Sequence, residues 1–123
     1  MVKLLVVDDE SEICEFLKSF FEERGYAVSV ANSGEKALEI VKQEKPQVIL
    51  LDIKMPGMDG IQSLREIRVC HPKAKVIMVT AIETRDKIEE CLRLGADNYI
   101  TKPLSLEYLE NDVAEKVESI SKT

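Results

Sequence analysis

Five short apolar runs alternate with longer amphipathic segments, and this alternation most constrains the fold of the chain. The runs lie at residues 3–7, 26–30, 48–51, 75–79 and 97–101. Apolar residues recur every three or four positions at residues 10–24, 33–44, 60–71, 84–94 and from Ser105 onward, which is typical of helices. Strict alternation of strand and helix predicts an α/β fold in which helices cover both faces of a parallel sheet.

The apolar content of the runs predicts the order of the strands. Residues 3–7, 48–51 and 75–79 are the most apolar and are expected at the centre of the sheet. Residues 26–30 alternate in polarity, which favours an edge strand. With right-handed crossovers, this pattern predicts a doubly wound sheet of order 2-1-3-4-5, with five helices.

Length and charge narrow the class of protein. A chain of 123 residues suits one domain, expected to span residues 1–123. The net charge of −6 disfavours nonspecific binding to nucleic acid or to an anionic membrane. The apolar runs are too short to span a bilayer, and the N-terminus lacks the layout of a signal peptide. Three widely spaced cysteines indicate reduced thiols, so a cytoplasmic location is expected.

Polar residues follow four of the five runs. Asp8 and Asp9 come after the first run, Asp52 after the third, Thr80 after the fourth and Lys102 after the fifth. The carboxyl ends of parallel strands meet at one edge of a sheet, which is where such folds bind ligands. We therefore expect three carboxylates, one hydroxyl and one ammonium to lie together.

The residue types indicate phosphoryl chemistry. Clustered carboxylates need a cation, and oxygen ligands suit Mg²⁺ or Mn²⁺. A carboxylate such as that of Asp52 can attack phosphorus, while a lysine neutralises the developing charge and a hydroxyl donates a hydrogen bond. Each residue alone also has a structural explanation; Asp8 and Asp9, for example, would favour the start of the following helix. Their joint occurrence at four strand ends favours a functional site.

Four ordered motifs carry a resemblance to a known family. They are VVDDE at residues 6–10, LLDIKMPGMDG at 50–60, VTA at 79–81 and GADNYITKP at 95–103. With them the whole chain resembles the receiver domain of a two-component response regulator. The resemblance implies a flavodoxin-like fold and a signalling switch rather than a turnover enzyme.

The resemblance also implies roles for individual residues. Asp52 would accept the phosphoryl group from a histidine kinase or a histidine phosphotransfer protein. Asp8, Asp9, Asp52 and the backbone carbonyl of Lys54 would hold Mg²⁺, or Mn²⁺ in its place. The chain would in turn act on a downstream output domain or target protein.

A conformational switch is implied by the same resemblance. Thr80 and Lys102 would contact the phosphoryl group, and Tyr99 would move between outward and inward positions. The output surface would comprise the fourth helix, the fifth strand and the fifth helix. The Lys102-Pro103 peptide bond is expected to be cis.

Two positions are expected to influence how long the phosphoryl group survives. In receivers the side chains two residues after the phosphoacceptor and two after the threonine flank the path of the attacking water, and here they are Lys54 and Ile82. Neither can accept a proton from that water, so a long-lived phosphoryl group is expected. Glu83 is a competing candidate that could orient the water.

Two other functions remain open from the sequence. The first is a Mg²⁺-dependent phosphatase with an aspartate nucleophile. Enzymes of that kind resembling the haloacid dehalogenase family carry a second Asp two residues after the first, where this chain has Lys54. The second is a scaffold that has lost phosphorylation, against which the complete set of strand-end residues argues. The lone histidine, His71, precedes Pro72 and is interpreted as a helix-end residue.

Overall fold

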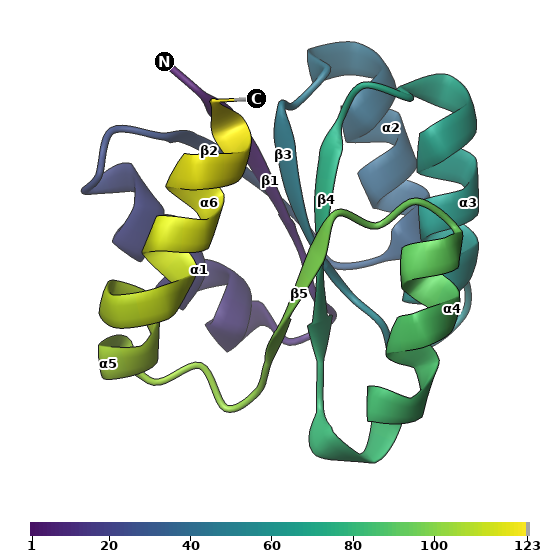
Figure 1. Cartoon of the computed structure of the whole chain (residues 1–123). Coiled ribbons are helices and arrows are strands. Elements are labelled where there is room, and N and C mark those ends of the chain that lie inside the picture. Colours follow the sequence, from purple (N-terminus) through teal and green to yellow (C-terminus); the bar gives the residue numbers. More distant parts are fainter. Residues whose placement is uncertain (123) are drawn as a thin grey trace.

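The fold is a five-stranded parallel sheet with helices on both faces (Figure 1). The computed structural model describes residues 1–122, apart from the side chains of Ile82 and Glu83. The strands are β1 (Lys3–Val7), β2 (Ala27–Ala31), β3 (Val48–Asp52), β4 (Lys75–Thr80) and β5 (Asn98–Thr101), in the order β2-β1-β3-β4-β5. All four strand pairs are parallel, so the predicted flavodoxin-like order is confirmed, with β2 at an edge.

Helical segments follow every strand. They are α1 (Ser11–Glu22), α2 (Gly34–Glu44), α3 (Gly60–Cys70), the 3₁₀ helix η1 (Ile82–Lys87), α4 (Ile88–Arg93), α5 (Leu106–Tyr108), the π-helical turn η2 (Leu109–Val113) and α6 (Ala114–Ser121). Most bounds lie within two residues of those predicted, the ordinary uncertainty of a helix end. Of the described residues, none belongs to a helix long and apolar enough to cross a membrane.

Two apolar cores cover the two faces of the sheet. Alternate residues of each strand point to opposite faces, so Leu5 and Val7 join the core beneath α2, α3 and α4, whereas Leu4 and Val6 join the core beneath α1 and α6. Figure 1 shows the same division, with α1, α5 and α6 on one side of the strands and α2, α3 and α4 on the other. The central strand β3 is buried along its whole length, which holds its last residue, Asp52, in a fixed position.

The fourth helix differs from its prediction. A single α-helix was expected over residues 84–94, but its first part is the 3₁₀ helix η1. The backbone N–H of Thr84 donates to the carbonyl oxygen of Ala81, three residues earlier, at 3.1 Å, and the Thr84 hydroxyl lies at the same distance from that oxygen. Bonds of this i to i−3 spacing are those of a 3₁₀ turn, and a threonine hydroxyl competing for backbone partners favours it.

The last helix also departs from a regular α-helix. The expected single helix after Ser105 contains the π-helical turn η2.

Some apolar residues at helical spacing lie outside the core. Leu109, Val113 and Val117 are fully buried, but Leu106, which shares their helical spacing, is 54% exposed. Phe16 on α1 is 41% exposed for the same reason: a residue can continue the apolar stripe of a helix and still project past the edge of the core.

Several predicted helix ends are confirmed. Gly25 and Gly95 have φ angles of 91° and 104°, the left-handed conformation that glycine adopts readily after a helix. His71 is the C-cap of α3, and its Nε2 lies 2.9 Å from the carbonyl oxygen of Pro46. The Lys102-Pro103 peptide bond is cis, as expected.

Candidate functional site

The strand register brings Asp8 and Asp52 side by side. Val7 of β1 is paired with Leu51 of β3, so the next residue of each strand occupies the neighbouring position at the carboxyl edge of the sheet. Both carboxylates are buried, with exposed fractions of 2% for Asp8 and 4% for Asp52. Asp8 accepts a hydrogen bond from the backbone N–H of Glu10 at 2.9 Å, which orients its side chain.

The loop between β3 and α3 fixes the surroundings of Asp52. The backbone N–H of Gly60, at the start of α3, donates to the carbonyl oxygen of Ile53 at 2.8 Å. A Cβ at position 60 would collide with the backbone of Asp52 and Ile53, so only glycine permits this close approach. Asp59 caps α3 by accepting a hydrogen bond from the backbone N–H of Gln62 at 2.9 Å.

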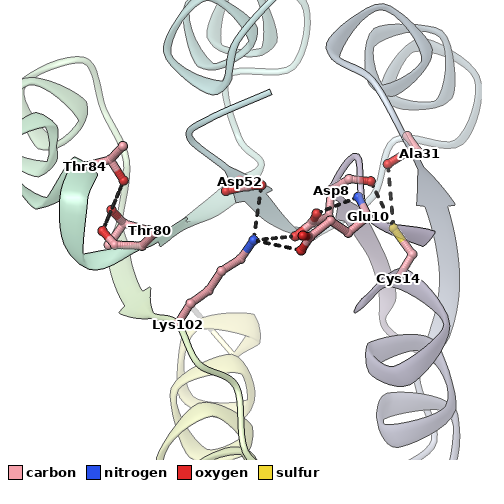
Figure 2. A network of polar contacts seen from close by, with 9 residues as sticks. Asp8, Glu10, Cys14, Ala31, Asp52, Thr80, Thr84 and Lys102 are labelled. Carbon is pink, nitrogen blue, oxygen red and sulfur yellow. Dashed lines mark hydrogen bonds and ion pairs between the residues drawn. The ribbon is translucent and has the colours of Figure 1, made fainter. Parts of the chain in front are cut away.

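The Lys102 ammonium lies among three carboxylates (Figure 2). Its Nζ is 3.2 Å from Asp8 Oδ2, 3.4 Å from Asp52 Oδ2 and 3.7 Å from Glu10 Oε2. Lys102 follows β5 directly, and its backbone N–H donates to the carbonyl oxygen of Thr80 at 2.8 Å. One positive charge therefore contacts three carboxylates, and the cluster has an excess of negative charge.

That excess changes the acidity of the buried groups. Burial raises the pKa of Asp52 from 3.8 to about 6, the negative charges of Asp8 and Asp9 act in the same direction, and Lys102 opposes them. Burial also raises the pKa of Asp8, against the Glu10 backbone hydrogen bond and the charge of Lys102. For Lys102, burial would lower the pKa, but the charges of Asp52 and Asp8 together outweigh it and raise the pKa.

The donor set fits a hard divalent cation. Asp8, Asp9 and Asp52 each offer one carboxylate oxygen, and these oxygens lie within 4.8 Å of one another. Asp8 and Asp52 are buried and Asp9 is exposed, which leaves the cluster open to solvent on one side. Carboxylate oxygens together with water are the ligands that Mg²⁺ prefers. Lys54 lines the same open cleft, together with Asp9, Asp52 and Lys102.

The Thr80 hydroxyl points away from the carboxylates. Thr80 is fully buried at the end of β4, and its Oγ1 lies 2.8 Å from Thr84 Oγ1 and 3.0 Å from the carbonyl oxygen of Ala81. Figure 2 shows the two paired hydroxyls at the edge of the site nearest η1, on the far side of Asp52 from Asp8. Thr80 is therefore beside the acidic cluster, but its hydroxyl is bonded elsewhere.

Tyr99 is in an outward position. It is 40% exposed on β5, and the Lys116 ammonium lies 6.0 Å from the centre of its ring. Lys116 Nζ also donates to the backbone carbonyl oxygen of Tyr99 at 3.3 Å. The predictions for the side chains of Ile82 and Glu83 fall outside the described part of the chain.

Two residues at the site were not singled out in the sequence. Glu10 contacts Lys102 directly, and its place immediately after two aspartates at a strand end was the available signal. Thr84 pairs with Thr80 across the junction of β4 and η1, a contact between a strand end and a 3₁₀ turn for which the sequence carried no signal.

Sequence comparisons identify a family. The family model of the response regulator receiver domain matches residues 4–114. Sporulation initiation phosphotransferase F of Bacillus subtilis (strain 168) is 39% identical over 111 residues, covering 90% of each chain. The transcriptional regulatory protein ZraR of Klebsiella oxytoca is 39% identical over 114 residues. This match spans 93% of the present chain but only 26% of ZraR.

Solved structures agree with this assignment. A response regulator receiver domain protein from Clostridium thermocellum is 30% identical and aligns with a TM-score of 0.90, covering 99% of this chain and 95% of that one. The receiver domain of Francisella response regulator 1452 is 34% identical, with a TM-score of 0.86 over 99% and 98% of the two chains. The motifs, the fold and these likenesses coincide, and the chain belongs to the response regulator receiver domain family.

Proposed function

We propose that this chain, as a single domain over residues 1–123, accepts a phosphoryl group on Asp52 from a phosphohistidine of a partner protein. The observation that carries the proposal is the buried Asp52 carboxylate, 3.4 Å from the Lys102 ammonium and grouped with the oxygens of Asp8 and Asp9. The partner is a histidine kinase or a histidine phosphotransfer protein.

The transfer is a displacement at phosphorus. A carboxylate oxygen of Asp52 forms the new P–O bond while the P–N bond to the partner's imidazole breaks, and the electron pair of that bond stays on the imidazole nitrogen. Asp8, Asp9, Asp52 and the Lys54 backbone carbonyl would hold Mg²⁺, or Mn²⁺ in its place, and the bound ion would supply positive charge to the phosphoryl oxygens. Lys102 supplies the second positive charge after turning from the carboxylates toward the phosphoryl group.

The phosphoryl group then favours a second conformation of the chain. Thr80 turns its hydroxyl to a phosphoryl oxygen, and Tyr99 moves inward into the space that Thr80 leaves. This exchange alters the surface formed by α4, β5 and the helical segment at residues 106–121, which is the output surface of the proposal. The phosphoryl group stabilises the inward arrangement because it contacts Thr80 only there.

Intact-mass measurement after treatment with acetyl phosphate and Mg²⁺ tests the phosphoacceptor. The parent chain should gain about 80 Da, one phosphoryl group, and the Asp52→Asn variant should gain nothing. A purified phosphohistidine protein in place of acetyl phosphate should label the same residue. An Asp52→Asn variant that still gains an acid- and base-labile adduct would overturn the assignment of Asp52.

A long phosphoryl lifetime suits onward transfer. Lys54 lines the cleft and lacks a proton acceptor, and Ile82 is apolar by residue type. We therefore propose slow hydrolysis and a relay role, in keeping with the name of the phosphotransferase relative from B. subtilis. Phosphorylated protein should decay faster in Lys54→Asn or in Ile82→Glu than in the parent. Loss of the group within seconds in the parent, or no acceleration in either variant, would contradict this.

The longer relatives suggest a second kind of output. ZraR is named as a transcriptional regulatory protein, and this chain corresponds to only about a quarter of it. A downstream output domain or target protein would read the altered surface. The alternative of a Mg²⁺-dependent phosphatase has less support, since the family match is to a receiver and Lys54 stands where such enzymes carry their second aspartate.

A further inference from the structure

Two buried hydroxyls meet at the junction of β4 and η1. Thr80 Oγ1 and Thr84 Oγ1 lie 2.8 Å apart, and the exposed fractions of the two residues are 0% and 7%. Both oxygens also lie close to the carbonyl oxygen of Ala81, at 3.0 Å from Thr80 and 3.1 Å from Thr84. A buried hydroxyl without a partner is costly, so this arrangement satisfies two groups at once.

The two protons of the pair can be assigned to its contacts. The Ala81 carbonyl already accepts the backbone N–H of Thr84 at 3.1 Å. If the Thr84 hydroxyl also donates to this carbonyl, the Thr80 hydroxyl donates to Thr84 Oγ1, and a chain of two hydrogen bonds results. In the opposite assignment Thr80 donates to Ala81 and accepts from Thr84. In both cases the bond between the hydroxyls is the shortest contact of Thr80 Oγ1, and it breaks when Thr80 turns toward Asp52.

We propose that Thr84 is a positioning residue whose hydroxyl holds the Thr80 hydroxyl toward η1 and so stabilises the resting state of the switch. The proposal rests on the proposed function, in which Thr80 turns to a phosphoryl group on Asp52. Thr84 contacts the Thr80 hydroxyl in the resting arrangement and loses it in the other, and only such a differential contact can shift an equilibrium between two states.

Substitutions of Thr84 can separate the effect of its hydroxyl group from the effect of its side-chain shape. Thr84→Val replaces the hydroxyl by a methyl group of similar size, so Thr80 keeps only the longer, shared contact with the Ala81 carbonyl. Thr84→Ser retains the hydroxyl and is the matched control. The resting state should be weakened in Thr84→Val and unchanged in Thr84→Ser. The equilibrium constant between the resting and the switched conformation should change by roughly two- to tenfold in Thr84→Val, the range that the free energy of one hydrogen bond spans.

Beryllofluoride with Mg²⁺ serves as the phosphoryl mimic in the test. Its apparent affinity for each variant is measured by titration, with the amide NMR signals of Thr80 and Tyr99 as reporters. Thr84→Val should bind beryllofluoride more tightly than the parent. Without beryllofluoride, its Tyr99 signal should already lie part of the way toward the bound position. Thr84→Ala should shift in the same direction and replaces the valine variant if that variant does not fold.

A double-mutant cycle with Thr80→Ala separates a positioning role from a purely structural one. In the Thr80→Ala background, Thr84→Val should no longer alter beryllofluoride affinity, because there is no Thr80 hydroxyl to hold. Equal affinity in the parent, Thr84→Val and Thr84→Ala would overturn the role of Thr84 while leaving the proposed function intact. An increase that persists in the Thr80→Ala background would do the same. A parent chain that does not bind beryllofluoride at all would overturn the proposed function and the role of Thr84 together.

Discussion

Each end of the sheet carries a basic side chain in contact with one or more acidic ones, and these two clusters differ in charge balance. At the amino end, the Arg68 guanidinium is paired with one carboxylate, Asp97, at 2.9 Å. It also donates to the backbone carbonyl oxygens of Gly95, Pro72 and Ala74. Asp97 in turn accepts the backbone N–H of Val76 at 2.8 Å. These hydrogen bonds tie the end of α3 to the start of β4 and to the loop before β5.

At the carboxyl end, one ammonium faces three carboxylates. Lys102 contacts Asp8, Glu10 and Asp52, and the pKa of Asp52 rises to about 6. A cluster with balanced charge and several hydrogen bonds to the backbone holds elements together and offers little to a ligand. A cluster with unbalanced charge is held in place by the surrounding fold and becomes more stable when a cation binds. The difference separates a structural cluster from a candidate functional site.

Replacing one carboxylate in each cluster, Asp52 or Asp97, by an amide should test this distinction most clearly. Asp52→Asn should abolish phosphoryl incorporation and, at pH 7.5 without divalent cations, stabilise the chain by about 1 kcal/mol, because it removes a buried charge from an excess. Asp97→Asn should retain phosphorylation but lose about 2 kcal/mol, because Arg68 loses its charged partner. Urea unfolding followed by circular dichroism, together with intact mass, measures both effects. Destabilisation by both substitutions would contradict the distinction.

The next largest effect should be the pH dependence of stability that Asp52 causes at the carboxyl end of the sheet. The pKa of Asp52 is about 6 in the folded chain against an ordinary value of 3.8, so the folded state holds this proton more tightly. The stabilisation that protonated Asp52 gives the folded state is complete below pH 3.8 and is lost as the pH rises through about 6. Without Mg²⁺ the loss should be on the order of 3 kcal/mol, since each unit of pKa corresponds to about 1.4 kcal/mol. Urea titrations at several pH values should show a smaller loss in Asp52→Asn, whereas an identical profile in both proteins would refute the assignment.

Mg²⁺ should stabilise the folded chain by binding only at the carboxyl end of the sheet. At ten times its dissociation constant a ligand of the native state adds ~1.4 kcal/mol, which raises the melting temperature by roughly 5 °C in a chain of this size. The increase should be larger at pH 7.5 than at pH 5, where Asp52 is largely protonated. It should vanish in Asp9→Ala and persist in Asp97→Asn. Scanning calorimetry with and without Mg²⁺ checks this, and an Asp9→Ala response equal to that of the parent would count against the metal site.

The smallest effect is expected at Glu10, the most exposed partner of Lys102. Its side chain is 61% exposed, and pairs of this kind contribute little. Glu10→Gln leaves Lys102 with two carboxylates and frees it to approach the phosphoryl donor. At saturating Mg²⁺ the rate of phosphorylation by acetyl phosphate should rise by roughly threefold or less. A tenfold or larger change would show that Glu10 belongs to the centre of the site and not to its rim.

The sequence alone determined the architecture and the composition of the site. Apolar runs alternating with amphipathic segments predicted the sheet and its order, because burial of strands on both faces leaves few arrangements. Parallel strands end at one edge, so Asp8, Asp52 and Lys102 could be expected to meet there. These are consequences of periodicity and topology, which are properties of the chain read in one dimension.

Only the tertiary structure decided which contacts the side chains make. It directed the Thr80 hydroxyl to Thr84, placed Glu10 within 3.7 Å of Lys102 and left Tyr99 outward beside Lys116. It also formed η1 and η2 where regular α-helix was expected. Rotamers, local turns and the pKa of a buried carboxylate depend on the neighbours that packing supplies. Those neighbours come from distant segments, at distances that a pattern of residue types does not specify.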